Sequence, residues 1–278
     1  MFFNHFKSLF NQEGSYDPTV LDELPQHQIH EGYDHPPTNE EIRNAILKLK
    51  NNAPGESGIM SQPLKALLNY SDTFLVLKRI MLNFWNTEIV PDEWNIGRLI
   101  VLPKKGDLSL PKNYRGIMLL EVTYKTVANI LYTRLLPIEE QLDHEQQCGF
   151  RPKRGCIDAI FTVKSAIRKR SEHGLESWVL FLDLIKAFDR VPRNLLWGIL
   201  SKYGVPNKLV NVLKALHSSF SVKIDNDLIT KPINNNIGVK QGDILGPILF
   251  TFFITATISS WRDACSATPC VFMCKKDS

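Results

Sequence analysis

Cysteine is scarce in this sequence of 278 residues, and the number of cysteines, five, is odd. Two lie near the middle of the chain and three near its end: Cys148, Cys156, Cys265, Cys270 and Cys274. No apolar leader of the kind that directs secretion is evident, so a disulfide framework is not expected. We expect reduced thiols in a nuclear or cytoplasmic protein. The last three cysteines are spaced loosely like zinc ligands, but no fourth ligand is evident near them.

A long hydrophobic run is also missing. The longest covers residues 244–258, about 15 residues, and contains Gly246 and Pro247. Crossing a bilayer takes ~20 apolar residues, so we expect no membrane partner and interpret this run as a buried helix. The sequence has no internal repeat, and its apolar content of 44% is ordinary for a globular protein.

The charge of the chain is distributed unevenly. The formal net charge is +4. Residues 98–170 contain 14 Lys and Arg against 7 Asp and Glu, a net of +7, so the remainder has a net of −3. A basic excess in one region is typical of a nucleic-acid groove. It is also compatible with a well-solvated surface.

Helical and strand-like segments are mixed along the chain. Thr38 and Glu41 form a capping-box pattern at the start of an amphipathic helix. Further helices are expected at about 72–86, 121–136, 156–170, 193–203, 207–217 and 244–258. Strands are expected at 98–103, 114–120, 178–182, 221–224 and 228–233. The strands lack a regular strand–helix–strand spacing, which favours an α+β fold over a doubly wound α/β fold.

One acidic residue directly follows an apolar segment. Residues 178–182 are all apolar, which predicts a buried strand, and Asp183 comes next. A carboxylate at the end of a rigid strand suits Mg²⁺, which prefers hard oxygen ligands. Phosphoryl transfer uses such ions to neutralise the leaving group. A turn former or helix cap often has the same placement, so both interpretations stay open.

A second candidate site is a glycine-rich turn. Gly238 and Gly242 would let the backbone approach a ligand closely, and Gln241 between them is an amide that could face a base or a sugar. The alternative is a tight turn ahead of the apolar helix.

Two basic segments could contact phosphates. On the predicted hairpin the cations are Lys104, Lys105 and Arg115. In a glycine-interrupted run at 147–155 they are Arg151, Lys153 and Arg154. For the hairpin cations the alternative is an exposed charged loop.

The order and spacing of these segments resemble the reverse transcriptase domain of LINE-type (non-LTR) retrotransposons over about residues 38–260. The matching stretches are the Thr38 helix, Ala53-Pro54-Gly55, Pro91-Asp92-Glu93-Trp94, Lys104-Lys105-Gly106-Asp107, Asn113-Tyr114-Arg115-Gly116-Ile117, Gly149-Phe150-Arg151, Ala187-Phe188-Asp189 and Gly238-Val239-Lys240-Gln241-Gly242.

The resemblance implies an RNA-directed DNA polymerase with a right-hand fold: helical and β fingers plus an incomplete palm with an antiparallel sheet, the thumb being absent. The implied division is 1–37 a linker or remnant of an upstream region, 38–97 an N-terminal helical extension, 98–176 the fingers and 177–278 a partial palm. The implied partners are an RNA template, a DNA primer and dNTPs.

The resemblance also implies residue roles. Asp183 resembles the catalytic palm carboxylate that binds Mg²⁺ or Mn²⁺, and Phe188 resembles the steric gate that excludes a 2′-hydroxyl. Gln241 and Gly242 resemble the turn that contacts the incoming nucleotide and the template. The implied triphosphate contacts are Lys104 or Lys105 and Arg115. The implied nucleic-acid contacts are Arg151, Lys153 and Arg154.

The family's aromatic-x-Asp-Asp motif, which supplies the remaining metal-binding acids, does not occur in these residues. We therefore expect a truncated polymerase fragment that does not polymerise alone. Asp243 stands where the family more often has a small or hydroxyl-bearing residue, so an acid is expected beside the nucleotide. A second candidate function is a non-enzymatic nucleic-acid-binding protein built on the same fingers and palm.

Overall fold

The computed structural model describes residues 2–11, 16–142, 147–224 and 232–264. Its helices are α1 (Phe2–Phe10), α2 (Val20–Glu23), α3 (Asn39–Leu47), α4 (Ser61–Ala66), α5 (Ser71–Thr87), α6 (Val122–Glu140), α7 (Cys156–Glu172), α8 (Arg193–Lys202), α9 (Asn207–Ser218) and α10 (Leu245–Ala264). Its strands are β1 (Ile96–Pro103), β2 (Tyr114–Leu119), β3 (Ser221–Ile224) and β4 (Ile233–Asn234). Most of these elements match the helices and strands predicted from the sequence. The three late cysteines lie outside the described residues.

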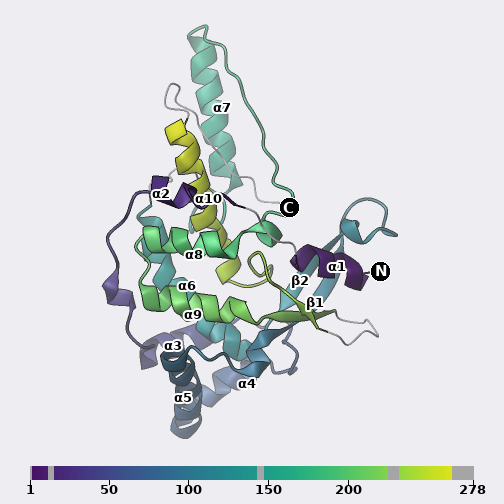
Figure 1. Ribbon diagram of the computed structural model, residues 1–278, viewed down its shortest axis with the longest axis vertical. Helices are drawn as coiled ribbons and strands as arrows, with labels where there is room; N and C mark the ends of the chain where they lie inside the picture. The colour runs from purple at the N-terminus through teal and green to yellow at the C-terminus, as the bar shows by residue number, and fades with distance from the viewer. Residues whose placement is uncertain (1, 12–15, 143–146, 225–231, 265–278) are drawn as a thin grey trace.

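The four strands of the described residues form one mixed sheet in the order β2-β1-β3-β4 (Figure 1). β1 and β2 pair antiparallel, with Val101 opposite Gly116. β3 runs parallel to β1 and antiparallel to β4. The expected antiparallel pairing holds for β3 with β4, the described strands of the region predicted as palm. β1 and β3 pair parallel because the chain passes through α6 to α9 before it returns as β3 in the direction of β1. The predicted mixture of helices and strands is confirmed, while the division into fingers and palm stays a prediction.

Four helices, α6, α8, α9 and α10, pack together beside the sheet (Figure 1). α6 and α10 are in contact along their buried faces, and α10 also packs on α8. The apolar run predicted as a buried helix is α10, whose Leu249 and Phe252 are fully buried. No helix among the described residues is long and apolar enough to span a membrane.

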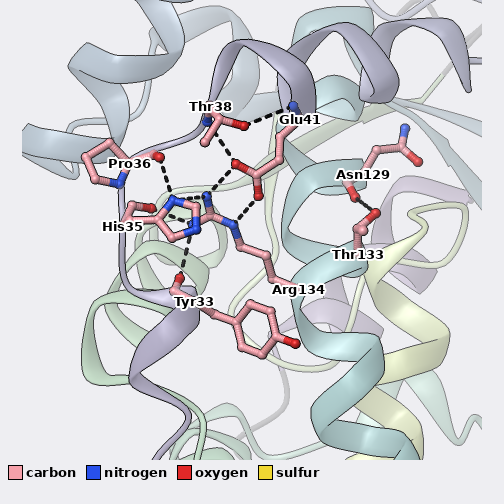
Figure 2. A network of polar contacts seen from close by, with 8 residues as sticks. All are labelled: Tyr33, His35, Pro36, Thr38, Glu41, Asn129, Thr133 and Arg134. Atoms are coloured by element: carbon pink, nitrogen blue, oxygen red, sulfur yellow. Dashed lines mark hydrogen bonds and ion pairs between the residues drawn. The ribbon is translucent and has the colours of Figure 1, made fainter.

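The segment before α3 is fastened to α6 through Arg134, which is 2% exposed. Its guanidinium donates to the Glu41 carboxylate at 2.7 and 2.9 Å. It also donates to the carbonyls of His35, at 2.7 Å, and Tyr33, at 3.1 Å (Figure 2). Glu41 at the same time completes the predicted capping box with Thr38, which is confirmed. A buried arginine with several acceptors is well compensated, so it fixes where the chain enters α3.

The first helix, α1, packs its apolar face against the sheet. Phe6 and Phe10 are 2% exposed, and the Phe6 ring approaches Gly116 so closely that an added Cβ there would lie 2.9 Å from it. Phe2 makes an edge-on ring contact with Tyr114. The N–H of Asn236 donates to the carbonyl of Phe10 at 3.0 Å. α1 therefore joins the β1–β2 hairpin to the chain that follows β4.

The prediction of a strand at 178–182 is wrong. These residues are extended but unpaired within the described chain, and Trp178 and Phe181 are 92% and 87% exposed. The prediction rested on burial, yet all five side chains of the segment are exposed. The helix predicted at 156–170 does form as α7, but none of its side chains is buried, and it projects away from the body in Figure 1.

Candidate nucleotide site

A cleft of about 1590 Å³ lies between the β1–β2 hairpin, α1, α7 and α10. Six of the ten residues with predicted roles line it: Lys104, Arg115, Asp183, Phe188, Gln241 and Gly242. The other four lie outside its lining: Lys105, Arg151, Lys153 and Arg154. Residues more than a hundred positions apart in the sequence therefore meet at one concave surface, which is the usual setting of a ligand site.

The glycine-rich turn is held by backbone hydrogen bonds to its neighbours. The N–H of Val239 donates to the carbonyl of Phe188 at 2.8 Å. Gly238 has a φ of +78°, and a Cβ there would lie 2.6 Å from the same carbonyl oxygen. The first glycine therefore allows the turn to lie directly against the backbone of the Ala187-Phe188-Asp189 motif.

The other side of the turn lies on β2. The N–H of Met118 donates to the carbonyl of Gln241 at 2.8 Å. Gly242 has a φ of +110°, and a Cβ there would lie 2.6 Å from the carbonyl oxygen of Met118. Both glycines are thus required by close approach, and the turn is fixed between β2 and Phe188.

Phe188 is half-buried beside this turn. Its ring stacks on Phe250 of α10, with centroids 4.9 Å apart, and meets Phe150 edge-on at 5.6 Å. Such offset and edge-on ring contacts are favourable beyond their buried area. The aromatic side chain therefore has a defined position in the cleft wall, which Gln241 also lines.

Asp183 lines the cleft, but the buried strand that was expected to hold it does not form. It lies on the exposed, unpaired segment, and its side chain is exposed. Among the described residues there is no group of three or more His, Cys, Asp or Glu side chains that could hold a metal ion. One exposed carboxylate does not provide the ligands that Mg²⁺ requires, so the described residues do not fit a metal site.

Lys186 is a cation of the cleft that sequence reasoning missed. It lies in the left-handed region with a φ of +54°, which is uncommon for a residue with a Cβ. It lines the cleft together with Lys104, Asp189 and His5. Burial raises the pKa of the Asp189 carboxyl to about 6, although the charges of Lys186 and Lys104 oppose the shift. Burial and the charge of Lys186 lower the pKa of His5.

The basic run around Arg151 precedes α7. Lys153 and Arg154 are exposed, and both Phe150 and Lys153 have positive φ values, +62° and +60°. The guanidinium of Arg151 donates to the carbonyl of Gln147 at 3.4 Å. The run thus presents cations to solvent beside the cleft rather than within it.

A buried polar layer lies under the glycine-rich turn, and sequence reasoning missed it. Asp243, which we expected beside the nucleotide, is 5% exposed and accepts a hydrogen bond of 2.5 Å from the Tyr124 hydroxyl. The carboxylate is bonded to α6, and Asp243 also belongs to the cleft lining, so its place beside the nucleotide stays a prediction.

Arg193 holds the same turn from the other side. Its guanidinium donates to the carbonyls of Gly238, His217 and Asn235 at 2.7–2.8 Å. A further bond of 2.6 Å runs to the Asn235 side chain. Burial lowers the pKa of the guanidinium to about 10. The chain leading into the turn is therefore held by one half-buried cation.

Comparison with known proteins agrees with the arrangement of these motifs. A family described as reverse transcriptase (RNA-dependent DNA polymerase) matches residues 102–274. The chain therefore belongs to the reverse transcriptase family, and the resemblance to non-LTR retrotransposon enzymes is confirmed.

Individual relatives come from mobile elements. The chain is 37% identical over 158 residues to the "Transposon TX1 uncharacterized 149 kDa protein" of Xenopus laevis, covering 56% of this chain and 12% of that protein. It is 29% identical over 227 residues to the Pol polyprotein from the R2 element of Popillia japonica, a match that covers 81% of this chain and 31% of that protein. It is 30% identical over 227 residues to the RNA-directed DNA polymerase from mobile element jockey of Drosophila melanogaster, a match that covers 78% of this chain and 24% of that protein. The chain thus spans less than a third of each of these relatives.

Proposed function

We propose that this chain is a fragment of an RNA-directed DNA polymerase of a non-LTR retrotransposon, with a pocket for an incoming dNTP. One observation carries the proposal: the Gln241–Gly242 turn, Phe188 and β2 with Arg115 meet at a single cleft. These three motifs are far apart in the sequence, and their convergence brings an amide, an aromatic ring and a guanidinium to one concave surface of the kind that binds a ligand.

In this proposal the cleft residues bind and orient the nucleotide. Arg115 offers a planar fork of donors and Lys104 a point charge, and both suit the oxygens of a triphosphate. The proposed role of the Phe188 ring is to contact the sugar, and the Gln241 amide can donate to and accept from a base or a sugar. The family's divalent ions would neutralise the leaving group, but the single carboxylate of Asp183 is not sufficient to hold them.

The proposed partners are an RNA template and a DNA primer, in the nucleus or cytoplasm. In the proposed division, residues 98–176 are fingers and 177–278 are part of the palm. The isolated chain should bind a dNTP without adding it to a primer.

Two assays on the 278-residue chain test this proposal. Equilibrium dialysis with a labelled dNTP should detect binding that weakens when Arg115 is changed to Met. The matched control is Arg79→Met on α5, where the side chain is exposed and far from the cleft lining. Primer extension on an RNA template with Mg²⁺ should give no product. No dNTP binding would refute the pocket, and sustained incorporation would refute the inactivity.

A second candidate function is a nucleic-acid-binding protein without catalysis. The exposed positions of Lys153 and Arg154 favour it, because cations beside the cleft can contact a strand without any nucleotide pocket. The two candidates differ in one measurement. RNA binding in the absence of dNTP binding would favour this second candidate.

A further inference from the structure

Lys240 is an ammonium group with no exposure to solvent, directly under the glycine-rich turn. Its Nζ donates to the carbonyl of Leu216 at 2.8 Å and to the Tyr124 hydroxyl at 3.2 Å. The same Nζ lies 3.7 Å from the ring centre of Phe220 and 4.4 Å from that of Tyr124. An isolated buried cation is costly, so these four contacts are what make its burial tolerable.

Tyr124 connects Lys240 with Asp243. The tyrosine hydroxyl accepts from Lys240 and donates to the Asp243 carboxylate. The second oxygen of that carboxylate accepts from the N–H of Leu245 at 3.3 Å, at the start of α10. Lys240 and Asp243 are the residues on either side of the Gln241–Gly242 pair. One side chain of α6 therefore holds both ends of the part of the turn that faces the cleft.

We propose that Lys240, Tyr124 and Asp243 are positioning residues that hold Gln241 and Gly242 in the conformation that receives the nucleotide. The proposal rests on the function proposed above and deepens it. None of the three side chains needs to touch the ligand. Their action is to spare the nucleotide the cost of ordering the turn when it binds.

The chemistry of the trio favours positioning over simple stabilisation. Burial lowers the pKa of Lys240 and raises that of Asp243, so each charged form exists at a cost that the other offsets. The guanidinium of Arg193 also acts on Lys240, and its charge lowers the pKa of the lysine further. The charge of Lys240 in turn lowers the pKa of His217. Apolar side chains of similar size fill a buried space as well as an ion pair does, and often better. What a hydrogen-bonded trio adds is direction, because each donor must meet its own acceptor.

The backbone around the trio is rigid enough to use that direction. A Cβ at Gly246 would lie 2.7 Å from the carbonyl oxygen of Lys240, so α10 packs directly on the turn. The carbonyl of Gln241 accepts from Met118 on the opposite side. Between these two contacts, the side chains of Lys240 and Asp243 determine which way the Gln241–Gly242 pair faces.

The test uses the 278-residue chain and a double variant, Lys240→Met with Asp243→Asn. Removing both charges leaves no uncompensated ion in the interior, and the main remaining cost is the Leu216 carbonyl that loses its donor. The chain should therefore stay folded, with a melting temperature lowered by only a few degrees. The affinity for a labelled dNTP should nevertheless fall about ten-fold, the effect of about one extra ordered side chain and its backbone. Tyr124→Phe, which removes only the hydroxyl, should also lower the affinity for dNTP.

Two controls match these variants in chemistry. Lys208→Met removes a lysine that pairs with Glu88 away from the cleft, and Tyr132→Phe removes a hydroxyl from the same helix, α6, outside the cleft lining. Neither should alter the dNTP affinity. If the double variant and Tyr124→Phe bind dNTP as the unmodified chain does, the positioning role is refuted.

A second readout separates this inference from the proposed function. Hydrogen exchange followed by mass spectrometry reports the Met118 and Val239 amides without any nucleotide, because both are bonded across the turn. Their exchange should become at least about ten-fold faster in the double variant while α9 remains protected. Unchanged exchange would overturn the positioning role. Faster exchange in a chain that binds no dNTP would retain the positioning role and refute the nucleotide pocket.

Discussion

The carbonyl of Gln241 accepts a hydrogen bond of 2.8 Å from the N–H of Met118. Met118 belongs to β2, the strand that also carries Arg115. The residue proposed to meet the nucleotide's base or sugar is therefore joined through backbone to the strand proposed to meet its phosphates. A displacement of either should alter the other, which makes this contact the first to test.

Gly242→Ala should break that contact. With a φ of +110° and a Cβ only 2.6 Å from the Met118 carbonyl oxygen, alanine there has both backbone strain and a clash. We expect the free energy of unfolding to fall by about 2–4 kcal/mol, measured by urea titration, and dNTP binding to be lost. The control is Gly174→Ala, which has a φ of +67° with open space around it. It should cost about 1 kcal/mol. Equal losses at both sites would refute the close approach.

Much of the local structure could be predicted from the sequence. The capping box of Thr38 and Glu41 is a local pattern, and it formed as expected. Strand pairing between β1 and β3 could not be predicted, because it joins segments separated by four helices. The segment 178–182 was misread since five apolar residues indicate burial only where another element covers them, and all five side chains are exposed.

The motifs of the candidate site could be predicted from the sequence, but the buried side chains that hold them in place could not. The turn at Gln241 and the ring of Phe188 were identified because their motif spacing is distinctive. Lys240 looked like one more cation of a motif, and only the fold brings Tyr124 and Leu216 around it. Lys186 gave no signal either, since a positive φ cannot be inferred from a lysine.

Arg193→Met should destabilise the chain more than any exposed arginine does. It would leave the carbonyls of Gly238 and Asn235 without their donor, and buried acceptors that lose a charged donor are expensive. We expect the free energy of unfolding to fall by about 3–5 kcal/mol. Arg168→Met, at an exposed ion pair with Glu172, is the control and should change it by no more than about 0.5 kcal/mol. A similarly small change at Arg193 would contradict these hydrogen bonds.

The stability of the chain should depend on the ionisation of Asp189. Its pKa in the folded chain is raised to about 6, whereas an unfolded aspartate titrates near 3.8. The folded state therefore favours the protonated acid, and this contribution is present in full below pH 4 and is lost as the pH rises to about 6. Asp189→Asn should remove the decline and raise the free energy of unfolding at pH 7 by about 2–3 kcal/mol. The check is urea unfolding of both proteins at pH 4 and pH 7. If the free energy of unfolding changes equally with pH in the two proteins, the pKa of Asp189 is not raised in the folded chain.

Phe188→Ala should weaken the distinction between dNTP and rNTP. The ring is held by Phe250 and Phe150, so in the proposed nucleotide pocket its edge would form a fixed wall against a 2′-hydroxyl. Competition dialysis of dATP against ATP should show discrimination by the unmodified chain and less of it in the variant. Phe253→Ala, on the cleft-lining face of α10, is the control for lost ring volume. Undiminished discrimination in Phe188→Ala would remove the steric-gate role.

RNA binding should be electrostatic and should depend on the basic run before α7. For single strands, the logarithm of the binding constant falls with the logarithm of salt concentration by about 0.7 for each phosphate that is neutralised. Replacing the exposed Lys153 and Arg154 by Ala should therefore reduce the slope by about 1.4. The matched control replaces Lys78 and Arg79 on α5, at the opposite end of the molecule from α7 in Figure 1, and should leave the slope unchanged. Filter binding of a labelled RNA from 50 to 300 mM salt, about the range over which such binding is lost, measures both slopes. An equal slope in the two double variants would mean that Lys153 and Arg154 do not contact the strand.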